Sequence, residues 1–102
     1  MGNKQNKFVD ACNKGDLKKI IYLIIKYNIN IHIYNEYGFR IACCNGYFNI
    51  VKYLLKYNIN IHIHMDDAFI VAYANHHIKI AKYLLSHGSY ELSCAHNIRI
   101  LL

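Results

Sequence analysis

Apolar residues recur three and four positions apart in three stretches of this chain, with polar residues between them. The three stripes are Leu17, Ile20, Ile21 and Ile24, then Ile50, Val51, Leu54, Leu55 and Tyr57, then Ile80, Ala81, Leu84 and Leu85. This spacing places the apolar side chains on one face of an α-helix. The pattern therefore predicts three amphipathic helices, each of which buries one face.

A shorter helix is predicted before each stripe. The three shorter helices are expected over Asn6–Asn13, Tyr37–Asn45 and Asp67–Asn75. Gly15 and Gly46 follow the first two of them, at tight turns where a positive φ can be required. His76 aligns with Gly46 at the third turn. The sequence therefore predicts three helix–turn–helix units.

The second helix of each unit should end at a left-handed residue and lead into an extended connector. The predicted ends fall at Asn28, Asn58 and Gly88, and Asn and Gly are the residues that take a left-handed C-cap most readily. The next segment, residues 29–33, alternates Ile with Asn or His, as a β-strand does. Its place between two helical units favours an extended loop, with alternate Ile side chains beneath the helices.

The units repeat in sequence as well as in pattern. The octapeptide Lys-Tyr-Asn-Ile-Asn-Ile-His-Ile occupies residues 26–33 and recurs unchanged at 56–63, 30 residues later. Repetition at a fixed period of roughly 20–50 residues marks a stacked array, in which each unit buries its apolar face against its neighbours. We therefore expect one all-α solenoid domain over residues 1–102. Its units cover about 7–36, 37–66 and 67–90, and 91–102 form a partial fourth unit or a C-terminal tail.

Two segments resemble the second helix of the ankyrin repeat, Gly-His-x-x-(Ile/Val)-Val-x-x-Leu-Leu. They are Gly46-Tyr-Phe-Asn-Ile-Val-Lys-Tyr-Leu-Leu55 and Asn75-His-His-Ile-Lys-Ile-Ala-Lys-Tyr-Leu-Leu85. Ala11-Cys12, Ala42-Cys43 and Ala72 fit the small residues of that family's first helix. The family's Thr-Pro-Leu-His is replaced by Tyr37-Gly38-Phe39-Arg40 and Asp67-Ala68-Phe69-Ile70. The period of 30, against about 33 in the family, implies short finger loops.

The resemblance implies a non-catalytic protein–protein interaction module that binds a protein partner, acts as a monomer, and needs no cofactor, metal or small-molecule substrate. Ankyrin arrays bind along a groove made by the finger loops and the first helices. The corresponding residues here are Tyr34, Glu36, Tyr37, Arg40, Cys44, Asn45, His64, Asp66, Asp67, Ile70, Ala74 and Asn75. Tyr34, Tyr37 and Arg40 are the expected anchors, because Tyr and Arg are enriched at interface hot spots.

The composition indicates the kind of genome that encodes the chain and suggests a second possible function. Asn, Ile, Lys and Tyr dominate while Pro and Trp are absent, as an A/T-rich genome would produce, and such units are similar to the ankyrin arrays of giant DNA viruses. A host protein would then be the partner. The net charge of +6 offers the alternative of binding nucleic acid or acidic surfaces. Lysines that follow codon bias and scatter over helix surfaces favour the simpler interpretation of a solvated face. A truncated family copy without a partner is a third reading.

The cysteines and the N-terminus indicate an intracellular protein. Four cysteines lack a disulfide-framework spacing, and residues 1–7 are too polar for a secretory signal. No apolar run approaches the ~20 residues of a membrane span, so no membrane association is expected. Met1-Gly2 begins like a myristoylation signal, but Asn6 stands where Ser or Thr is required.

Metal and catalytic chemistry have weak support in the sequence. His62-x-His64, His76-His77 and Cys94-x-His96 lack the ligand spacing of a zinc site. Cys43-Cys44 has no adjacent base or orienting carboxylate, as a nucleophile needs. No phosphate-binding glycine loop occurs. We therefore expect neither an enzyme nor a metal site.

Overall fold

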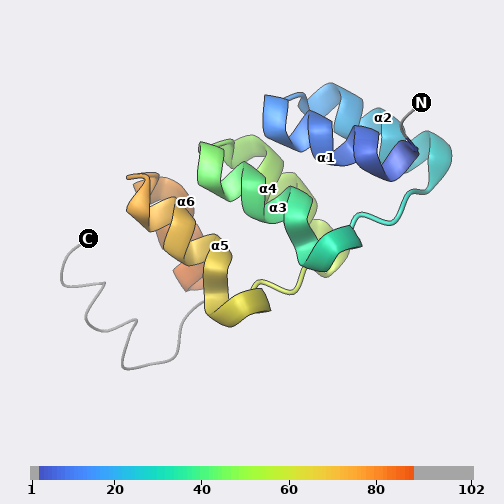
Figure 1. Cartoon of the computed structure of the whole chain (residues 1–102). Coiled ribbons are helices and arrows are strands. Elements are labelled where there is room, and N and C mark those ends of the chain that lie inside the picture. The colour runs from blue at the N-terminus through green and yellow to red at the C-terminus, as the bar shows by residue number, and fades with distance from the viewer. Residues whose placement is uncertain (1–2, 89–102) are drawn as a thin grey trace.

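The computed structural model describes residues 3–88 and shows three pairs of helices stacked side by side (Figure 1). The elements are α1 (Lys4–Lys14), α2 (Leu17–Tyr27), α3 (Ile33–Asn45), α4 (Phe48–Leu54) with the short 3₁₀ helix η1 (Leu55–Tyr57), α5 (Ile63–Ala74) and α6 (Ile78–Ser86). No strand occurs within residues 3–88, so the predicted all-α repeat fold is confirmed. The predicted partial unit over 91–102 lies outside the described residues.

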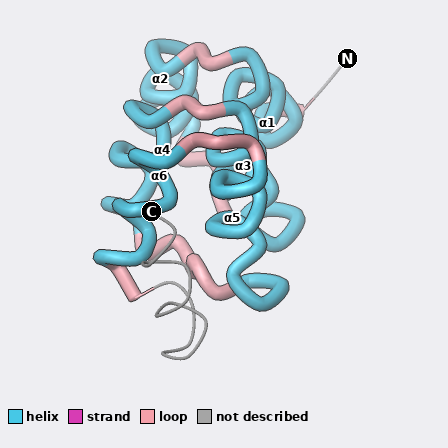
Figure 2. The backbone as a smooth tube through the Cα atoms, turned by 90° about the vertical axis from the view of Figure 1, so that its left-hand side faces the viewer, coloured by secondary structure: helices cyan, strands magenta, loops and turns pink. Residues whose placement is uncertain are grey.

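The helices form two layers (Figure 2). The first helices α1, α3 and α5 pack on one another in one layer, which we call the first-helix layer, and α2, α4 and α6 form the second-helix layer. Close approach of α1 and α3 depends on Gly38, because a Cβ atom there would lie 2.6 Å from the Phe8 ring. Buried Ala11, Ala42 and Ala72 keep the same layer thin. The paired small residues predicted from the sequence serve this contact.

A ladder of phenylalanines forms the centre of the core. Phe8, Phe39 and Phe69 occupy equivalent positions in the three units, and each side chain is at most 1% exposed. The second helices supply Ile20, Ile50, Leu54, Ile80 and Leu84, which are also buried. These side chains belong to one hydrophobic cluster with members in all three units, so the core is continuous along the array.

The extra residue of the first unit is absorbed within its second helix. Gly15 and Gly46 are 31 residues apart, whereas the left-handed caps Asn28 and Asn58 are 30 apart. α2 has 11 α-helical residues, but the equivalent segment has 7 residues in α4 and 3 in η1. A 3₁₀ residue rises about 2.0 Å against about 1.5 Å in an α-helix, so the three residues of η1 advance as far as four α-helical residues. Both segments therefore have the same length.

This offset changes which residues of α2 are buried. The predicted stripe was Leu17, Ile20, Ile21 and Ile24. In the structure Ile20 and Leu23 are buried, while the other three stripe residues are only partly buried. Ile20 and Leu23 correspond to Val51 and Leu54 at the 31-residue offset, so alignment on the octapeptide placed the stripe one residue out of register.

The connectors begin as predicted and then turn in an unexpected way. Ile31 and Ile61 are buried beneath the helices, and Asn30 Oδ1 accepts a hydrogen bond from His32 N at 3.0 Å. Beyond that point Tyr34, Asn35 and Glu36 have φ of 54°, 53° and 63°, which is left-handed backbone. His64, Met65 and Asp66 repeat it. The predicted extended finger is therefore a single left-handed turn in both connectors, and the regular part of α3 starts at Tyr37.

The turns inside the units carry the predicted positive φ. Gly15 and Gly46 have φ of 78° and 84°, and His76 has φ of 64°. The ring of Tyr47 lies over Gly15 and the imidazole of His77 lies over Gly46, so close that an added Cβ would meet them at 2.9 and 2.5 Å. A ring of the next unit therefore packs directly on the backbone of each turn glycine.

None of the helices within residues 3–88 is long and apolar enough to cross a bilayer.

Replacing His76 with glycine is expected to raise the urea midpoint of unfolding. A left-handed residue with a side chain costs about 1–2 kcal/mol, and greater freedom of the unfolded chain offsets about 0.4–1 kcal/mol of that gain. The expected net effect is a stabilisation between about 0 and 1.6 kcal/mol. Gly46→Ala is the matched control and should lower the midpoint, because its turn is both left-handed and covered by His77. A lower midpoint for His76→Gly would contradict the left-handed assignment.

Candidate functional site

The left-handed turns give the array an edge of projecting side chains. We call this surface the finger edge and define it as Tyr34, Tyr37, His64, Met65 and Ile70. All five side chains are exposed, and Met65 is the most open at 88%. They lie on the two connectors and on the starts of α3 and α5, at the end of the helices opposite the inter-helix turns. The surrounding polar residues determine how this edge is held.

Glu36 was predicted to line the groove, and this prediction is wrong because the side chain is 5% exposed. Its carboxylate accepts a hydrogen bond from His32 Nδ1 at 2.8 Å and from Asn60 N at 2.8 Å. Asn60 belongs to the connector of the next unit. Glu36 therefore joins its own left-handed turn to the following connector and does not face a partner.

Asp66 occupies the equivalent place in the third unit and is corrected in the same way. Its side chain is buried, at 6% relative exposure for the residue. His62 Nδ1 donates to its carboxylate at 2.6 Å. The recurrence of a histidine bonded to a buried carboxylate four residues later shows that the octapeptide histidines, His32 and His62, are structural.

Arg40 is an inter-unit bridge more than an anchor for a partner. Its Nη1 donates to Asp67 Oδ2 at 3.1 Å, and its Nε donates to Asn35 O at 3.1 Å. The guanidinium also lies 5.6 Å from the centre of the Tyr37 ring. Only 19% of the Arg40 side chain is exposed. The expectation that Arg40 is a contact anchor is therefore corrected: it fixes the left-handed turn and pairs with Asp67.

The predicted residues near the C-terminal ends of the first helices also bond between units. Asn45 Nδ2 donates to Asn13 O at 3.2 Å. Asn75 Nδ2 contacts Cys44 Sγ at 3.4 Å. These contacts lie at the other end of the first helices from the finger edge, beside the inter-helix turns. Ala74 is exposed there and small. The twelve predicted residues thus divide between the finger edge, the buried carboxylates, the Arg40–Asp67 pair and the residues at the C-terminal ends of α3 and α5.

Sequence reasoning did not include Met65. Met65 aligns with Asn35 at the middle of the left-handed turn, and its exposure exceeds that of every other large hydrophobic residue within 3–88. The sequence did contain a signal for this residue, because Met65 is apolar at a loop position where the preceding unit has Asn35. Met side chains adapt to irregular surfaces and suit contact with a partner.

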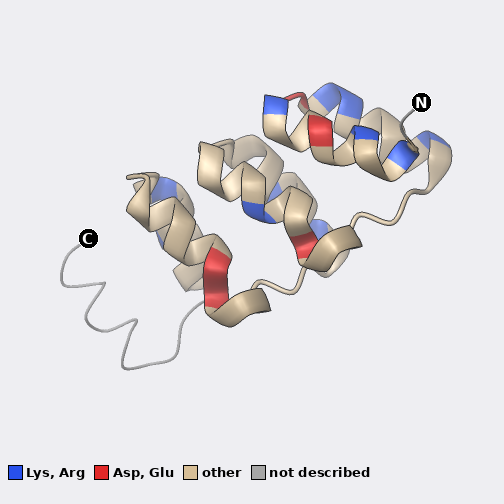
Figure 3. Cartoon of the chain, viewed as in Figure 1, with Lys and Arg blue, Asp and Glu red and all other residues tan. Residues whose placement is uncertain are grey.

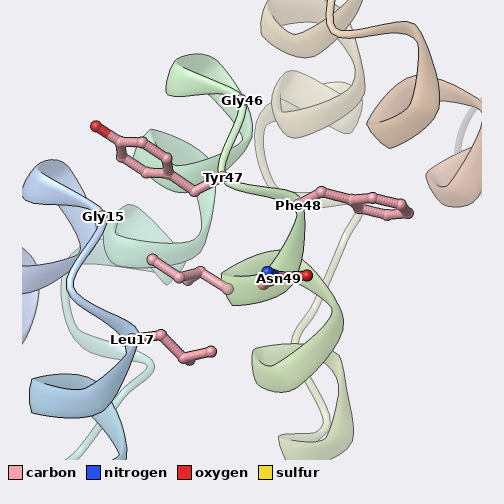
Figure 4. Close-up of a pocket in the computed structure, with 7 residues that line it drawn as sticks. Gly15, Leu17, Gly46, Tyr47, Phe48 and Asn49 are labelled. Atoms are coloured by element: carbon pink, nitrogen blue, oxygen red, sulfur yellow. The ribbon is translucent and has the colours of Figure 1, made fainter.

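A shallow pocket separates the first two units at the inter-helix turns (Figure 4). Its volume is about 380 Å³, and its lining is Gly15, Leu17, Gly46, Tyr47, Phe48, Asn49 and Ile50. Figure 4 shows Phe48 pointing away from Gly15, toward the third unit, where its ring meets Tyr83 edge to face at 5.3 Å. None of the predicted site residues lines this pocket, and no charged side chain does.

The histidines, cysteines and carboxylates do not assemble a reactive centre in the described part of the chain. No three such side chains converge within residues 3–88. Burial raises the pKa of the Cys12 thiol to about 12 and also raises the pKa of Cys43. Both thiols therefore stay protonated at neutral pH, whereas a nucleophilic cysteine needs its thiolate.

A thiol reagent at about pH 8 is expected to label Cys44 in the folded protein and to spare Cys12 and Cys43. Cys44 is half-buried, while the other two thiols are at 0% exposure. Fragmentation mass spectrometry distinguishes the adjacent Cys43 and Cys44. The denatured chain provides the control, because Cys12 and Cys43 should then react as well. Rapid labelling of Cys43 in the native protein would contradict the packing of α3 against α1.

Comparison with known proteins decides the family. A family model described as ankyrin repeats in three copies matches residues 8–94, most of the chain. This chain is an ankyrin-repeat protein. No match was found among curated proteins or among solved structures. Ankyrin repeats are generally protein–protein interaction modules.

The departures from the ankyrin signature have structural roles here. Where the family has Thr-Pro-Leu-His, Gly38 allows α1 to approach and Phe39 fills the core. Arg40, in the last place of that motif, bonds to Asp67 of the next unit. The ankyrin repeats of this chain therefore keep contacts between units while changing the residues that make them.

Proposed function

We propose that this ankyrin array is a non-catalytic scaffold that binds a protein partner through the finger edge. The observation that supports it is the exposure of Tyr34, Tyr37, Met65 and Ile70 beside turns that hydrogen bonds hold in place. Arg40 and Asn60 bond to the first turn, and His62 bonds to Asp66 in the second. Exposed aromatic and Met side chains are enriched in the cores of protein interfaces. Rigid turns lower the entropy lost when a partner binds.

The partner we propose is a protein inside the cell, bound by one copy of the array. The absence of a disulfide-framework spacing in the sequence supports the intracellular setting. The resemblance of the A/T-biased units to viral ankyrin arrays supports a host protein as the partner. The apolar character of the finger edge, whose nearest carboxylates are buried or paired with Arg40, favours an apolar segment of that partner.

The test is capture of partners from cell extract by the whole chain and by variants. Tyr37→Ala combined with Met65→Ala should remove a specific partner and leave the circular dichroism spectrum unchanged, because both side chains are exposed. Lys52→Ala combined with Lys82→Ala is the control, since both residues lie on the second-helix layer. If the Tyr37→Ala, Met65→Ala double variant keeps the partner and the lysine double variant loses it, the partner binds the second-helix layer and the proposal is wrong.

Arg40→Ala is unsuitable for that test because it breaks the bonds to Asp67 and Asn35. The reading of a basic nucleic-acid binder predicts capture that falls steeply with salt and ignores nucleotide sequence. The reading of a copy without a partner predicts that wild type and the finger-edge variant capture the same proteins. Each outcome separates one reading from the other two.

A further inference from the structure

The second-helix layer carries seven of the eleven Lys and Arg residues within residues 3–88, and Figure 3 shows where basic and acidic residues lie along the array. Its helices and η1 carry seven lysines and no carboxylate; the lysines are Lys18, Lys19, Lys26, Lys52, Lys56, Lys79 and Lys82. All seven are exposed, and none forms an ion pair within residues 3–88. Asp16, just before α2, caps that helix by accepting a bond from Lys19 N at 3.1 Å. The lysines are therefore segregated, where the sequence alone suggested scatter.

The other described carboxylates lie on the first-helix layer and are neutralised or buried there. Asp10 pairs with Lys14 at 3.1 Å and Asp67 pairs with Arg40 at 3.1 Å, while Glu36 is buried. The acidic side chains thus do not offset the lysines on the opposite layer. The helices of the first-helix layer carry four basic residues, Lys4, Lys7, Lys14 and Arg40, and four carboxylates, so their formal charges balance. The second-helix layer keeps its seven lysines, and an approaching anion meets a net positive field there.

α2 adds exposed apolar side chains to this charge. Ile25 is 73% exposed and Tyr22 is 51% exposed. Tyr22 lies four residues after Lys18, and Ile25 and Lys26 lie three and four residues after Tyr22, so all four share one face of α2. α4 and α6 expose no large hydrophobic residue. An exposed Ile and Tyr between lysines is therefore a property of α2 and is absent from the equivalent helices.

We propose that the second-helix layer docks on an anionic lipid surface, with Ile25 and Tyr22 of α2 entering the headgroup region. Helices that lie on membranes combine lysines with a few apolar and aromatic side chains, and they bind through both contributions. Tyr is enriched at the boundary between lipid headgroups and water in membrane proteins. The second helices α2, α4 and α6 lie in one layer (Figure 2), so a single lipid surface can meet the exposed lysines of all three.

Two other occupants fit less well. A nucleic acid would use the lysines on its phosphates and leave Ile25 without a role. A second copy of the chain would bring the same seven lysines against this layer, and like charges oppose such a contact. An anionic lipid surface satisfies the lysines and the apolar side chains at once. The docking proposal is independent of the finger edge, which lies on the first-helix side.

The test is co-sedimentation of the whole chain with lipid vesicles at low salt. Vesicles of phosphatidylcholine with roughly 30% phosphatidylserine should bind the chain, and vesicles of phosphatidylcholine alone should not. Each lysine near an anionic leaflet contributes roughly a five-fold change in affinity, so Lys18→Gln with Lys26→Gln should weaken binding roughly 25-fold. Ile25→Asn should weaken it roughly 5- to 10-fold. All three side chains are exposed, so folding should be retained.

Lys14→Gln is the matched control, because it removes one positive charge from α1, where Lys14 is paired with Asp10. We expect this variant to bind vesicles within about two-fold of wild type, because the charge it removes lies outside the proposed contact. Three results would overturn the proposal. These are equal binding to both vesicle types, binding that Ile25→Asn leaves unchanged, and tighter binding to a DNA duplex that ignores Ile25→Asn. Self-association without lipid that Ile25→Asn abolishes would assign the surface to a second copy.

Discussion

Replacing Phe39 with alanine is expected to cost about 3–5 kcal/mol of the free energy of unfolding, as truncation of a buried aromatic residue does. Phe39 lies in the middle unit, 1% exposed, between the equivalent rings of Phe8 and Phe69. The cavity would open at the centre of the array, where both neighbouring units lose contacts. Since single domains have only about 5–15 kcal/mol to lose, much of the chain should unfold at moderate urea.

Urea titration followed by circular dichroism measures this loss. Phe48→Ala is the matched control, because the Phe48 ring is half-buried against Tyr83 and its removal should cost clearly less. A loss for Phe39→Ala as small as that for Phe48→Ala would show that the phenylalanine ladder does not carry the core.

Glu36→Ala is the second large effect, with an expected loss of about 2–3 kcal/mol. The change removes the acceptor for Asn60 N and for His32 Nδ1, and it breaks the bond that the Asn60 amide makes across the units. Glu36→Gln keeps one carbonyl oxygen that can accept the Asn60 bond, so it should recover part of the loss. Removal of a surface charge alone would cost far less.

Hydrogen exchange at the Asn60 amide gives a readout that overall stability does not. Protection of this amide should fall more in Glu36→Ala than in Glu36→Gln. Asp10→Ala is the control, because it breaks an exposed ion pair with Lys14 on α1. An Asn60 amide that stays protected in Glu36→Ala would mean that the carboxylate does not join the units.

The helices and their ends were predictable because the signals are local. The stripe in α4, the caps at Asn28 and Asn58 and the turn at Gly46 depend on spacing and on the φ that each residue tolerates. The left-handed turn at 34–36 was not predictable in this way, because three successive non-glycine residues there oppose intrinsic preference. A bond to Glu36 from Asn60, 24 residues away in the sequence, holds the turn, and Arg40, which bonds to Asn35 O, is itself paired with Asp67. Spacing rules do not include such contacts.

The candidate site was predictable in place but not in chemistry. Tyr34, Tyr37 and His64 are exposed, but Glu36 and Asp66 are buried, against the usual exposure of carboxylates. Their partners are a histidine four residues earlier and, for Glu36, a backbone N–H of the next unit. The four-residue spacing between each histidine and its carboxylate points to a bond only once the fold is known. Nothing in the sequence pattern indicates the bond from Asn60 of the next connector to Glu36.

The contacts between a turn glycine and the ring of the next unit decide which unit of this array tolerates duplication. A second copy of residues 37–66, inserted after residue 66, would place a Tyr47 ring over the first copy's Gly46, as Tyr47 now covers Gly15. A unit stacked behind His76 would meet a side chain where the other two turns offer a bare backbone. Lengthening by gene duplication, or by design, is therefore open through the middle unit and obstructed through the third.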